Sequence, residues 1–279
     1  MKNLIILTVA FCLSLTSYAQ SAQTEQNYPI SKDIKKSFKQ NKFGISFQTK
    51  KWSNTEKVNG KEFVKFSGTL NGIKLDYRYD FKSNPFFFET ALGYVTSENT
   101  NYDGGSQDGK SFSYKDTNSI ADFDLQLGRF FTLNDFISAK LSAGFYFRSL
   151  SNPRVNYKKN DYGRRIHYQT FALKAGTIFS LTQRFFIHPQ VRYDHLLAGR
   201  VLVKFSDLDP RSSDLLLKQR KGRGYRLDLT FGYTFNNFTL AMTPYYRSWD
   251  LEDSDMAVGF LEPKNKTESI GLDIGVKLF

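Results

Sequence analysis

The sequence predicts an all-β protein: a closed antiparallel transmembrane β-barrel of about ten strands, with eight or twelve as alternative counts. Two observations lead to this fold class. From Phe43 onward, apolar and polar residues alternate with the period of two that belongs to a β-strand. The second face of nearly every such segment also carries charged residues, so a water-soluble β-sandwich would have no sequestered core. The apolar face is therefore expected to contact lipid.

The first nineteen residues have the pattern of a secretory signal peptide. Lys2 precedes an apolar run from Leu4 to Leu15, and Ser17-Tyr18-Ala19 forms a small-x-small cleavage site. The run is only about twelve residues long, too short to cross a bilayer as a helix. Cys12, the only cysteine, lies inside this run, so the mature chain is expected to contain no thiol and no disulfide.

Residues 20–42 are polar and rich in lysine, without the apolar period that fills a core. We expect them to form a periplasmic N-terminal arm, and residues 43–279 to form the barrel. The clearest barrel strand is Tyr225–Phe235, which turns at Asn236-Asn237, a two-residue hairpin signal. The other expected strands are Phe43–Trp52, Ile73–Phe81, Phe86–Tyr94, Ala121–Leu127, Ile137–Phe147, Phe171–Leu181, Phe185–Tyr193, Phe238–Met242 and Ile270–Phe279.

The connections alternate between short and long. Short turns fall near Ser83, Leu133, Gln183 and Asn236, and long polar loops are expected at 53–66, 97–118, 149–165, 199–223 and 250–268. Outer-membrane barrels have short periplasmic turns and longer extracellular loops, so this asymmetry orients the barrel and predicts both chain ends in the periplasm. Pro189 and Pro244 fall inside expected strands, and each predicts a bulge or a different strand boundary there.

The chain is basic, with a formal net charge of +12. Removing residues 1–19 takes away Lys2 and no acidic residue, which leaves about +11. An exported chain seldom meets nucleic acid, whereas lipid A phosphates line the outer leaflet of an outer membrane. We therefore expect lipopolysaccharide and outer-membrane lipid as partners, no nucleic acid, no cofactor, and a monomer. The three histidines, His167, His188 and His195, show no ligand spacing, so no metal site is expected.

The interior of the expected barrel is charged. Strand parity points ten basic and eight acidic side chains inward, and side chains of opposite sign would interdigitate and fill a narrow lumen. This pattern predicts a plugged barrel, and a narrow channel lined by the same charges is the alternative. Four aromatic residues near the strand tops, Trp52, Tyr245, Tyr246 and Trp249, are expected in the aromatic belt at the headgroup level. The inward residues are Lys50, Lys74, Arg78, Lys140, Arg148, Lys174, Arg192, Arg226, Arg247, Lys277, Asp76, Asp80, Glu89, Asp122, Asp124, Asp194, Asp228 and Asp273.

Size and layout over most of the mature chain resemble the omptins, ten-strand outer-membrane proteases. Asn101–Asp108 lies where omptins carry their first carboxylates, Ile120–Leu125 looks like the strand that follows, and Phe205–Pro210 falls where their Asp-His loop would be. The terminal Phe279 after an alternating strand is similar to the signal read by the barrel assembly machinery, an expected partner during biogenesis. The resemblance implies a catalytic Asp pair facing an Asp-His pair across the extracellular lip.

The sequence departs from the omptin pattern at the catalytic positions. Arg211 stands where the histidine after Asp209 would be, and a guanidinium remains protonated and cannot act as a general base. Asp103 and Asp108 are five residues apart instead of two, and such loop aspartates usually form Asx turns. Asp194 and His195 are neighbours on a strand and point to opposite faces. The catalytic candidates are therefore only Asp103, Asp108, Asp209 and His195.

The outer loops collect positive charge, and phosphates of lipid A are the nearest anions for it. The sequence thus favours a non-enzymatic barrel with a role in envelope structure or surface adhesion. An omptin-like protease or a lipid A hydrolase is the alternative, and a narrow channel is a second one. The candidate lipid A-binding residues are Arg200, Lys204, Arg211, Lys218, Arg220, Lys221 and Arg223.

Overall fold

The computed structural model describes residues 42–81, 84–105, 111–153, 163–207 and 209–278. The expected signal peptide, and all of the expected arm except Lys42, lie outside these ranges. Lys42 is the first residue of a strand, so the barrel begins one residue earlier than predicted. No helix in the described part of the chain is long and apolar enough to cross a membrane.

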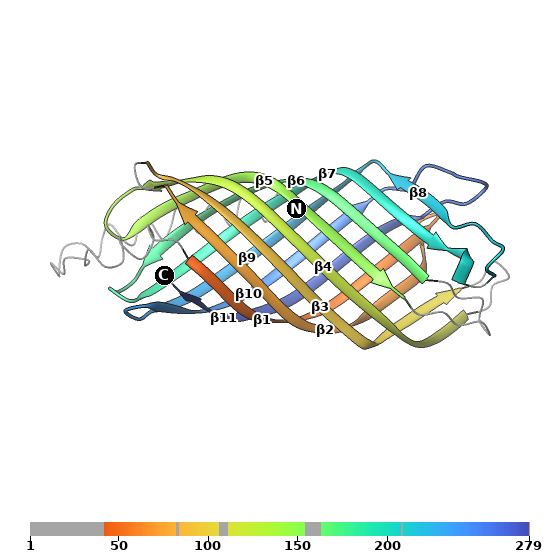
Figure 1. Cartoon of the computed structure of the whole chain (residues 1–279), viewed down its shortest axis with the longest axis horizontal. Coiled ribbons are helices and arrows are strands. Elements are labelled where there is room, and N and C mark those ends of the chain that lie inside the picture. Colours follow the sequence, from red (N-terminus) through yellow and green to blue (C-terminus); the bar gives the residue numbers. More distant parts are fainter. Residues whose placement is uncertain (1–41, 82–83, 106–110, 154–162, 208, 279) are drawn as a thin grey trace. The chain divides into compact units, whose positions relative to one another are not determined.

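The described chain is almost entirely β-structure (Figure 1). A single short 3-10 helix, η3 (Phe205–Asp207), interrupts the described strands. The strands are β1 (Lys42–Val58), β2 (Lys61–Asp80), β3 (Phe86–Gly105), β4 (Ser111–Thr132), β5 (Ile137–Asn152), β6 (Gly163–Ser180), β7 (Phe185–Lys204), β8 (Leu215–Gln219), β9 (Gly222–Thr234), β10 (Phe238–Leu251) and β11 (Lys264–Leu278).

The sheet closes on itself because β1 pairs with both β2 and β11. Every pairing is antiparallel. Strands β8 and β9 lie end to end along β7 and together occupy one position in the wall. The barrel therefore has ten strand positions, which confirms the predicted closed barrel and the count of about ten. Because the wall is closed, each strand has a neighbour on both sides to which its backbone N–H and C=O groups can hydrogen-bond, as a lipid environment requires.

All ten predicted strand segments coincide with observed strands, but the observed strands continue well past them at one end. At the other end, Phe81, Leu181 and Phe235 lie one residue beyond the strands, and Phe279 lies outside the described residues. The four short turns lie together at the left end of the view in Figure 1, as predicted, and the extensions lie at the opposite, outer end. A strand needs only about 9–11 residues to cross a bilayer. Since β4 has 22 residues, the barrel wall projects beyond the membrane on the outer side.

Each predicted long loop is therefore shorter than expected. The loop predicted at 53–66 is wrong, because β1 and β2 run through it and meet in a two-residue turn at Asn59 and Gly60, with φ of 51° and 77°. Those angles are the ones that Asn-Gly favours in hairpins. Strands also enter the loops predicted at 97–118, 149–165, 199–223 and 250–268, and residues 106–110 and 154–162 within the first two lie outside the described residues.

Two bulges reverse strand parity at the base of the outer extension. In β3 the pairing shifts by one residue between Ser97 and Thr100, relative to β4, and in β7 it shifts next to Leu197, relative to β6. An extra residue on one strand reverses which side chains face inward beyond it. Consequently Asp103 and Arg200 point out of the barrel, where uninterrupted alternation would have pointed both inward.

The two prolines inside strands cause neither a bulge nor a strand end, so that prediction is wrong. Pro189 lies within β7 and Pro244 within β10, and the strand register is the same on both sides of each. The ladders only lack pairs locally, between β6 and β7 next to Pro189 and between β9 and β10 next to Pro244. Losing one N–H donor is thus absorbed by a short gap in each ladder.

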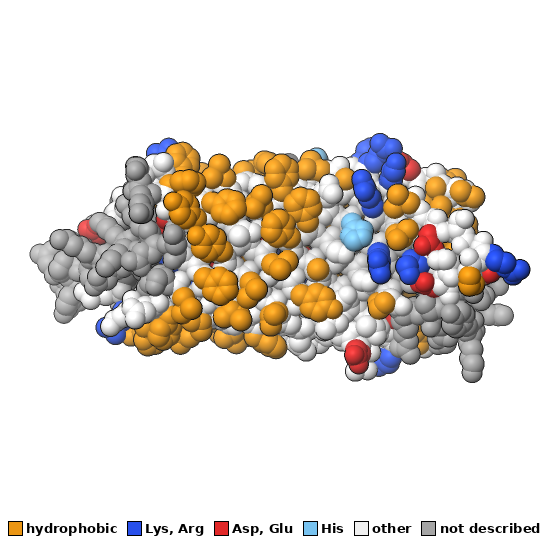
Figure 2. Space-filling view, viewed as in Figure 1, with side chains coloured by type: hydrophobic (Ala, Val, Ile, Leu, Met, Phe, Trp, Pro, Cys, Tyr) orange, Lys and Arg blue, Asp and Glu red, His pale blue; other side chains and the backbone are white. Residues whose placement is uncertain are grey.

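An apolar band encircles the exterior of the barrel on the side of the four short turns, which we call its lower part. Figure 2 shows hydrophobic side chains gathered over the left and central parts of the visible face, with Lys and Arg side chains concentrated towards the right. Every strand of the band contributes exposed apolar side chains, for example Phe47, Ile73, Leu127 and Ile274. We call the part of the barrel inside this band the membrane half, and the part beyond it the outer half.

The interior changes character between the two halves. The membrane half contains the predicted charged side chains, whereas the outer half contains a buried apolar core. The prediction of a charge-filled lumen is therefore wrong for the outer half. The outer core consists of Trp52, Val64, Phe66, Leu70, Val95, Ile120, Tyr146, Leu150, Ile166, Tyr168, Ala172, Leu196, Val201, Val203, Leu217, Trp249 and Leu251.

The predicted aromatic belt is wrong for three of its four residues. Trp52, Tyr245 and Trp249 are 2%, 6% and 1% exposed and lie inside the barrel, while Tyr246 points outward. Parity explains this, because Trp52 shares a strand face with the inward Lys50, and Trp249 shares one with Arg247. Trp249 packs between the rings of Tyr146 and Tyr168, at centroid distances of 6.2 and 6.3 Å. These rings close the lumen above the charged half.

Candidate functional site

A group of basic side chains lies on the outer surface of β6 to β9, directly above the apolar band. Arg200 on β7 is directly opposite His167 on β6 and Lys218 on β8. Below this row, His195 on β7 is directly opposite Arg223 on β9. All five side chains are exposed. Directly opposite residues in an antiparallel pair have Cα atoms about 4.5–5.5 Å apart. We call these five residues the basic patch.

The basic patch carries positive charge that no described carboxylate neutralises. Arg200, Lys218 and Arg223 form no ion pair with any residue in the described ranges. Asp250 stands opposite Arg223 on β10, but no ion pair within 4.0 Å joins them. Lys221 is also exposed, in the break between β8 and β9.

Three of the other predicted lipid A ligands are engaged with carboxylates instead. Lys204 pairs with Asp207 at 2.8 Å, Arg211 with Asp209 at 3.2 Å, and Arg220 with Asp255 at 2.7 Å. The structure thus separates the seven predicted residues into four without an acidic partner and three with one. Sequence alone could not make this distinction, because it depends on the bulge in β7 and on the course of the loops.

Aromatic side chains lie at the lower edge of the basic patch. Tyr193 and Tyr225 stand directly opposite each other, one step on the same outward face below the opposed pair His195 and Arg223, and their ring centroids are 5.3 Å apart. Paired aromatic rings between apolar and charged surfaces are typical of the level where lipid headgroups begin. The basic patch therefore lies at headgroup height.

The predicted catalytic residues do not converge in the described structure. Asp103 is exposed on the outer face of β3, Asp108 lies outside the described residues, and His195 belongs to the basic patch. Asp209 accepts hydrogen bonds from the backbone N–H of Arg211, at 3.0 Å, and from its guanidinium. These bonds hold the pKa of Asp209 below its ordinary value. Asp209 therefore forms an Asx turn, whereas the turn predicted for Asp103 is wrong, because Asp103 lies within β3 and pairs with Ser113 on β4. Asp194 and His195 lie on opposite faces, as predicted.

A buried ion cluster that the sequence did not predict lies at the outer end of the lumen. Arg164, which falls within the loop predicted at 149–165, points inward and donates to both Glu56, at 2.7 Å, and Glu262. Glu262 belongs to the loop between β10 and β11 and is 4% exposed. Burial raises its pKa to about 7, and Glu56 adds to this effect while Arg164 opposes it. We call these three residues the outer clamp.

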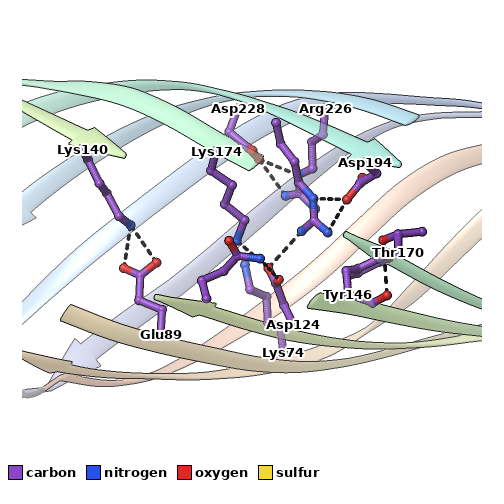
Figure 3. A network of polar contacts seen from close by, with 12 residues as sticks. Lys74, Glu89, Asp124, Lys140, Tyr146, Thr170, Lys174, Asp194, Arg226 and Asp228 are labelled. Atoms are coloured by element: carbon purple, nitrogen blue, oxygen red, sulfur yellow. Dashed lines mark hydrogen bonds and ion pairs between the residues drawn. The ribbon is translucent and has the colours of Figure 1, made fainter. Parts of the chain in front are cut away.

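Ion pairs line the lumen of the membrane half (Figure 3). Asp124 accepts from both Lys174 and Arg192, and Asp194 from both Arg192 and Arg247. Every inward charge predicted from parity points inward, so the predicted composition of this half is confirmed. The pairs include Lys74 with Asp273, Arg78 with Asp80, Lys140 with Glu89, Arg226 with Asp228, and Lys277 with Asp76.

Within the described residues, no group of three or more His, Cys, Asp or Glu side chains is arranged to hold a metal ion. His188 points into the lumen, whereas His167 and His195 point outward in different rows of the basic patch, opposite Arg200 and Phe171 respectively.

Comparison with known proteins gives a likeness in fold. No protein-family model matches the chain, and no curated protein matches it in sequence. Among solved structures, the outer membrane protease OmpT from Escherichia coli superposes with a TM-score of 0.60 at 12% identity, over 85% of this chain and 96% of that one. The outer membrane protein OprG from Pseudomonas aeruginosa gives a TM-score of 0.39 at 10% identity, over 86% and 96% of the two chains.

The translocator domain of the autotransporter NalP from Neisseria meningitidis gives a TM-score of 0.34 at 13% identity, over 96% of each chain. At such identities these likenesses concern the fold and not the chemistry. The closed wall and the encircling apolar band are the features by which a β-barrel satisfies its backbone and contacts lipid in a bilayer. The chain thus has the fold of the outer membrane protease OmpT, a closed antiparallel β-barrel, here with ten strand positions.

Proposed function

We propose that this protein is a non-enzymatic outer-membrane barrel that is anchored in the lipopolysaccharide leaflet by the basic patch and serves envelope structure or surface adhesion. The observation that carries the proposal is the pair Arg200 and Lys218, two cations directly opposite each other that have no acidic partner among the described residues. Like charges directly opposite on a sheet repel and destabilise it. An anion between them would turn this repulsion into attraction.

Lipid A phosphates are the anions available at this height on the barrel. A guanidinium forms two parallel hydrogen bonds with a phosphate, and an ammonium group adds a further donor. The Tyr193–Tyr225 pair supplies flat apolar surface for the beginning of the acyl chains. The basic patch and the tyrosine pair thus suit the two parts of lipid A, its anionic phosphates and its apolar acyl chains.

The closed lumen favours a structural role over transport. The stacked rings of Tyr146, Tyr168 and Trp249, together with Trp52, fill the barrel above its charged half. We expect no stepwise ionic conductance when the purified barrel is inserted into planar bilayers. Reproducible open-channel steps from the unaltered protein would contradict a plugged barrel and favour the channel alternative.

A matched pair of variants tests the lipid A proposal. Arg200→Gln, Lys218→Gln and Arg223→Gln together remove three unpaired cations, and Lys204→Gln, Arg211→Gln and Arg220→Gln remove three paired ones. Both triple variants change the net charge equally. We expect the first to weaken lipopolysaccharide binding by at least about tenfold, since charge-assisted hydrogen bonds contribute about 1.5–3 kcal/mol each. The second should change it by less than about threefold.

The binding would be measured with purified barrel and lipopolysaccharide in detergent at fixed ionic strength. Equal losses in the two triple variants would mean that only net charge matters, and no loss in either would remove the proposal. For the enzyme alternative, we expect intact cells to show no cleavage of dibasic peptides. Cleavage that disappears on replacing Asp103 or Asp209 would establish the protease instead.

A further inference from the structure

The membrane half encloses a cavity of about 230 Å³ that the proposed function does not use. Residues from most strands line it, including Lys74, Asp124, Lys140, Lys174 and His188. Its lining also includes Lys42 and Lys277, near the periplasmic ends of β1 and β11. A water takes up about 30 Å³ in the liquid, so the cavity has room for several waters or for one hydrated oxyanion. We call it the lumen chamber.

Positive charge exceeds negative charge around the lumen chamber. Among the described inward side chains of the membrane half, the basic ones outnumber the carboxylates, and a net charge enclosed by a lipid-embedded wall is costly unless it is neutralised. The basic ones are Lys42, Lys50, Lys74, Arg78, Lys140, Arg148, Lys174, Arg192, Arg226, Arg247 and Lys277. The carboxylates are Asp76, Asp80, Glu89, Asp122, Asp124, Asp194, Asp228 and Asp273.

Several of the carboxylates are already shared between cations, among them Asp124, Asp194 and Asp273. Asp273 accepts hydrogen bonds from Gln48, at 3.0 Å, and Lys74, at 3.3 Å, and lies 3.7 Å from Arg226. Asp124 likewise serves both Lys174 and Arg192. An ammonium group has three protons to donate, so Lys74 and Lys174 each retain donors after binding one carboxylate. Those donors belong to side chains that line the chamber.

His188 is a second, independent sign of a missing ligand. It lines the lumen chamber, and its Nε2 atom is buried without a hydrogen-bond partner among the described residues. A buried polar atom without a partner costs free energy. In the tautomer with the proton on Nε2, His188 can donate a hydrogen bond to an anion in the chamber.

The way out of the chamber towards the cell surface is blocked. The outer core, with Trp52 and Trp249 among its buried side chains, fills the lumen on that side, whereas the lining of the chamber reaches the periplasmic strand ends. We infer that the lumen chamber is a binding site for a small multivalent oxyanion of the phosphate type, held by Lys74, Lys140, Lys174 and His188. It is a site of binding and not of passage.

The test uses inorganic phosphate as the probe. Purified barrel in a non-ionic detergent is titrated calorimetrically with phosphate at pH 7, with ionic strength held constant by chloride. We expect saturable binding of one equivalent. Lys174→Met should weaken it by at least about tenfold through the lost charge-assisted hydrogen bond. This variant suits the purpose because Asp124 keeps Arg192 as a partner at 2.9 Å.

A second variant should act in the opposite direction. Asp228→Asn increases the positive excess, and Arg226 still has Asp273 at 3.7 Å, so phosphate should bind several-fold more tightly. A variant that merely loosened the barrel would weaken binding in both cases. Heat-dependent migration in SDS gels shows that each variant is folded.

Variants at the surface separate this site from the basic patch. Arg200→Gln with Lys218→Gln should leave the one-equivalent phosphate binding unchanged, because both side chains are outside the barrel. Loss of binding in that variant, absence of saturable binding, or equal affinities of the unaltered protein and Lys174→Met would overturn the inference. So would NMR of labelled lysines showing neutral amines in the phosphate-free chamber at pH 7, because the charge excess would then vanish without an anion.

Discussion

The two halves of the barrel have opposite interiors and opposite exteriors, although the same strands build both. On β1, Ile45 and Phe47 are about half exposed on the outside of the membrane half, while Lys50 is buried inside it. A few residues further along, Trp52 is buried inside and Lys57 is exposed outside. Parity is unchanged between these positions. The surrounding solvent, lipid in one half and water in the other, therefore decides which face is apolar.

Each half of the barrel is therefore stabilised by a different kind of interaction. In the membrane half the wall gains nothing from burying apolar side chains inside, and its interior is held by paired charges. The outer half has water on its outside, so an apolar interior stabilises it as in a soluble protein. Disrupting each half in its own way should therefore have distinct consequences.

The largest effect is expected from removing a shared carboxylate of the membrane half. Asp194 is fully buried and accepts from Arg192 and Arg247, so Asp194→Asn leaves two guanidinium groups with less compensation. We expect the free energy of unfolding to fall by about 3–5 kcal/mol in urea titrations of the lipid-inserted barrel. The surface pair Glu252 with Lys264 is the control, and Glu252→Gln should cost less than about 1 kcal/mol. Similar losses would contradict the assignment of cohesion to charge pairs.

An effect of similar size is expected in the outer core. Trp249 is 1% exposed, and Trp249→Ala should lower the free energy of unfolding by about 3–5 kcal/mol, because a cavity remains. Leu127 is 57% exposed on the membrane half, and lipid refills the space that Leu127→Ala leaves. That change should cost about 2 kcal/mol from transfer alone. If Trp249→Ala cost no more than Leu127→Ala, the outer half would not have a soluble-type core.

The outer clamp makes the outer half sensitive to pH. The pKa of Glu262, raised to about 7 from its ordinary value of 4.5, means that its protonated form is favoured by folding. This contribution to stability is complete below about pH 4.5 and is lost as the pH rises through about 7. The facing groups are Arg164, Glu56 and Tyr168. The loop between β10 and β11 should thus be held more loosely at pH 8.5 than at pH 5.

A spin label on Val258→Cys, at the exposed tip of that loop, measures this loosening. We expect the mobile fraction to rise several-fold between pH 5 and pH 8.5, and Glu262→Gln to abolish the pH dependence. The same pH response in the Glu262→Gln protein would show that another group titrates. The membrane half, without the clamp, should give no such response from a label at Leu127→Cys.

The smallest effect concerns two tight turns at the outer end. Asn59-Gly60 and Val258-Gly259 have nearly the same backbone, with φ of 51° and 77° in the first and 49° and 77° in the second. Asparagine tolerates positive φ, whereas a β-branched valine does so only under strain. Val258→Asn should stabilise the protein by about 1 kcal/mol and Asn59→Val should destabilise it by a similar amount. Unfolding titrations that gave the same sign for both would contradict this account.

The membrane half could be predicted from sequence because lipid imposes a uniform rule. Alternation identified its strands, its turns and its inward charges, such as Asp124 and Arg192. The outer half could not, because charged residues on its outer face and short apolar stretches look like loop sequence. Lys57, Lys61 and Lys65 made the 53–66 segment resemble a loop, although Val64 and Phe66 already alternated with Lys65.

The candidate site was predictable in composition but not in arrangement. The excess of basic residues after Gly199 was visible in the sequence, yet one extra residue at Leu197 determines that Arg200 faces outward. The outer clamp needs Glu56, Arg164 and Glu262, which are far apart in the chain, and no local pattern brings them together. Long-range contacts of this kind follow from register, which bulges change without a clear sequence signal.

The break between β8 and β9 is a weak point in the hydrogen-bonded wall of the barrel. Gln219 pairs with Gly199 and Arg223 with His195, so the segment of β7 between these two partners has no ladder on that side, and the bulge at Leu197 disturbs the other side too. A closed barrel otherwise has no edge from which to unzip. Amide hydrogen exchange should therefore begin at this break, at the boundary of lipid and water. Under mechanical pulling on the outer end, neighbouring strands should separate at this break before they separate elsewhere in the described wall.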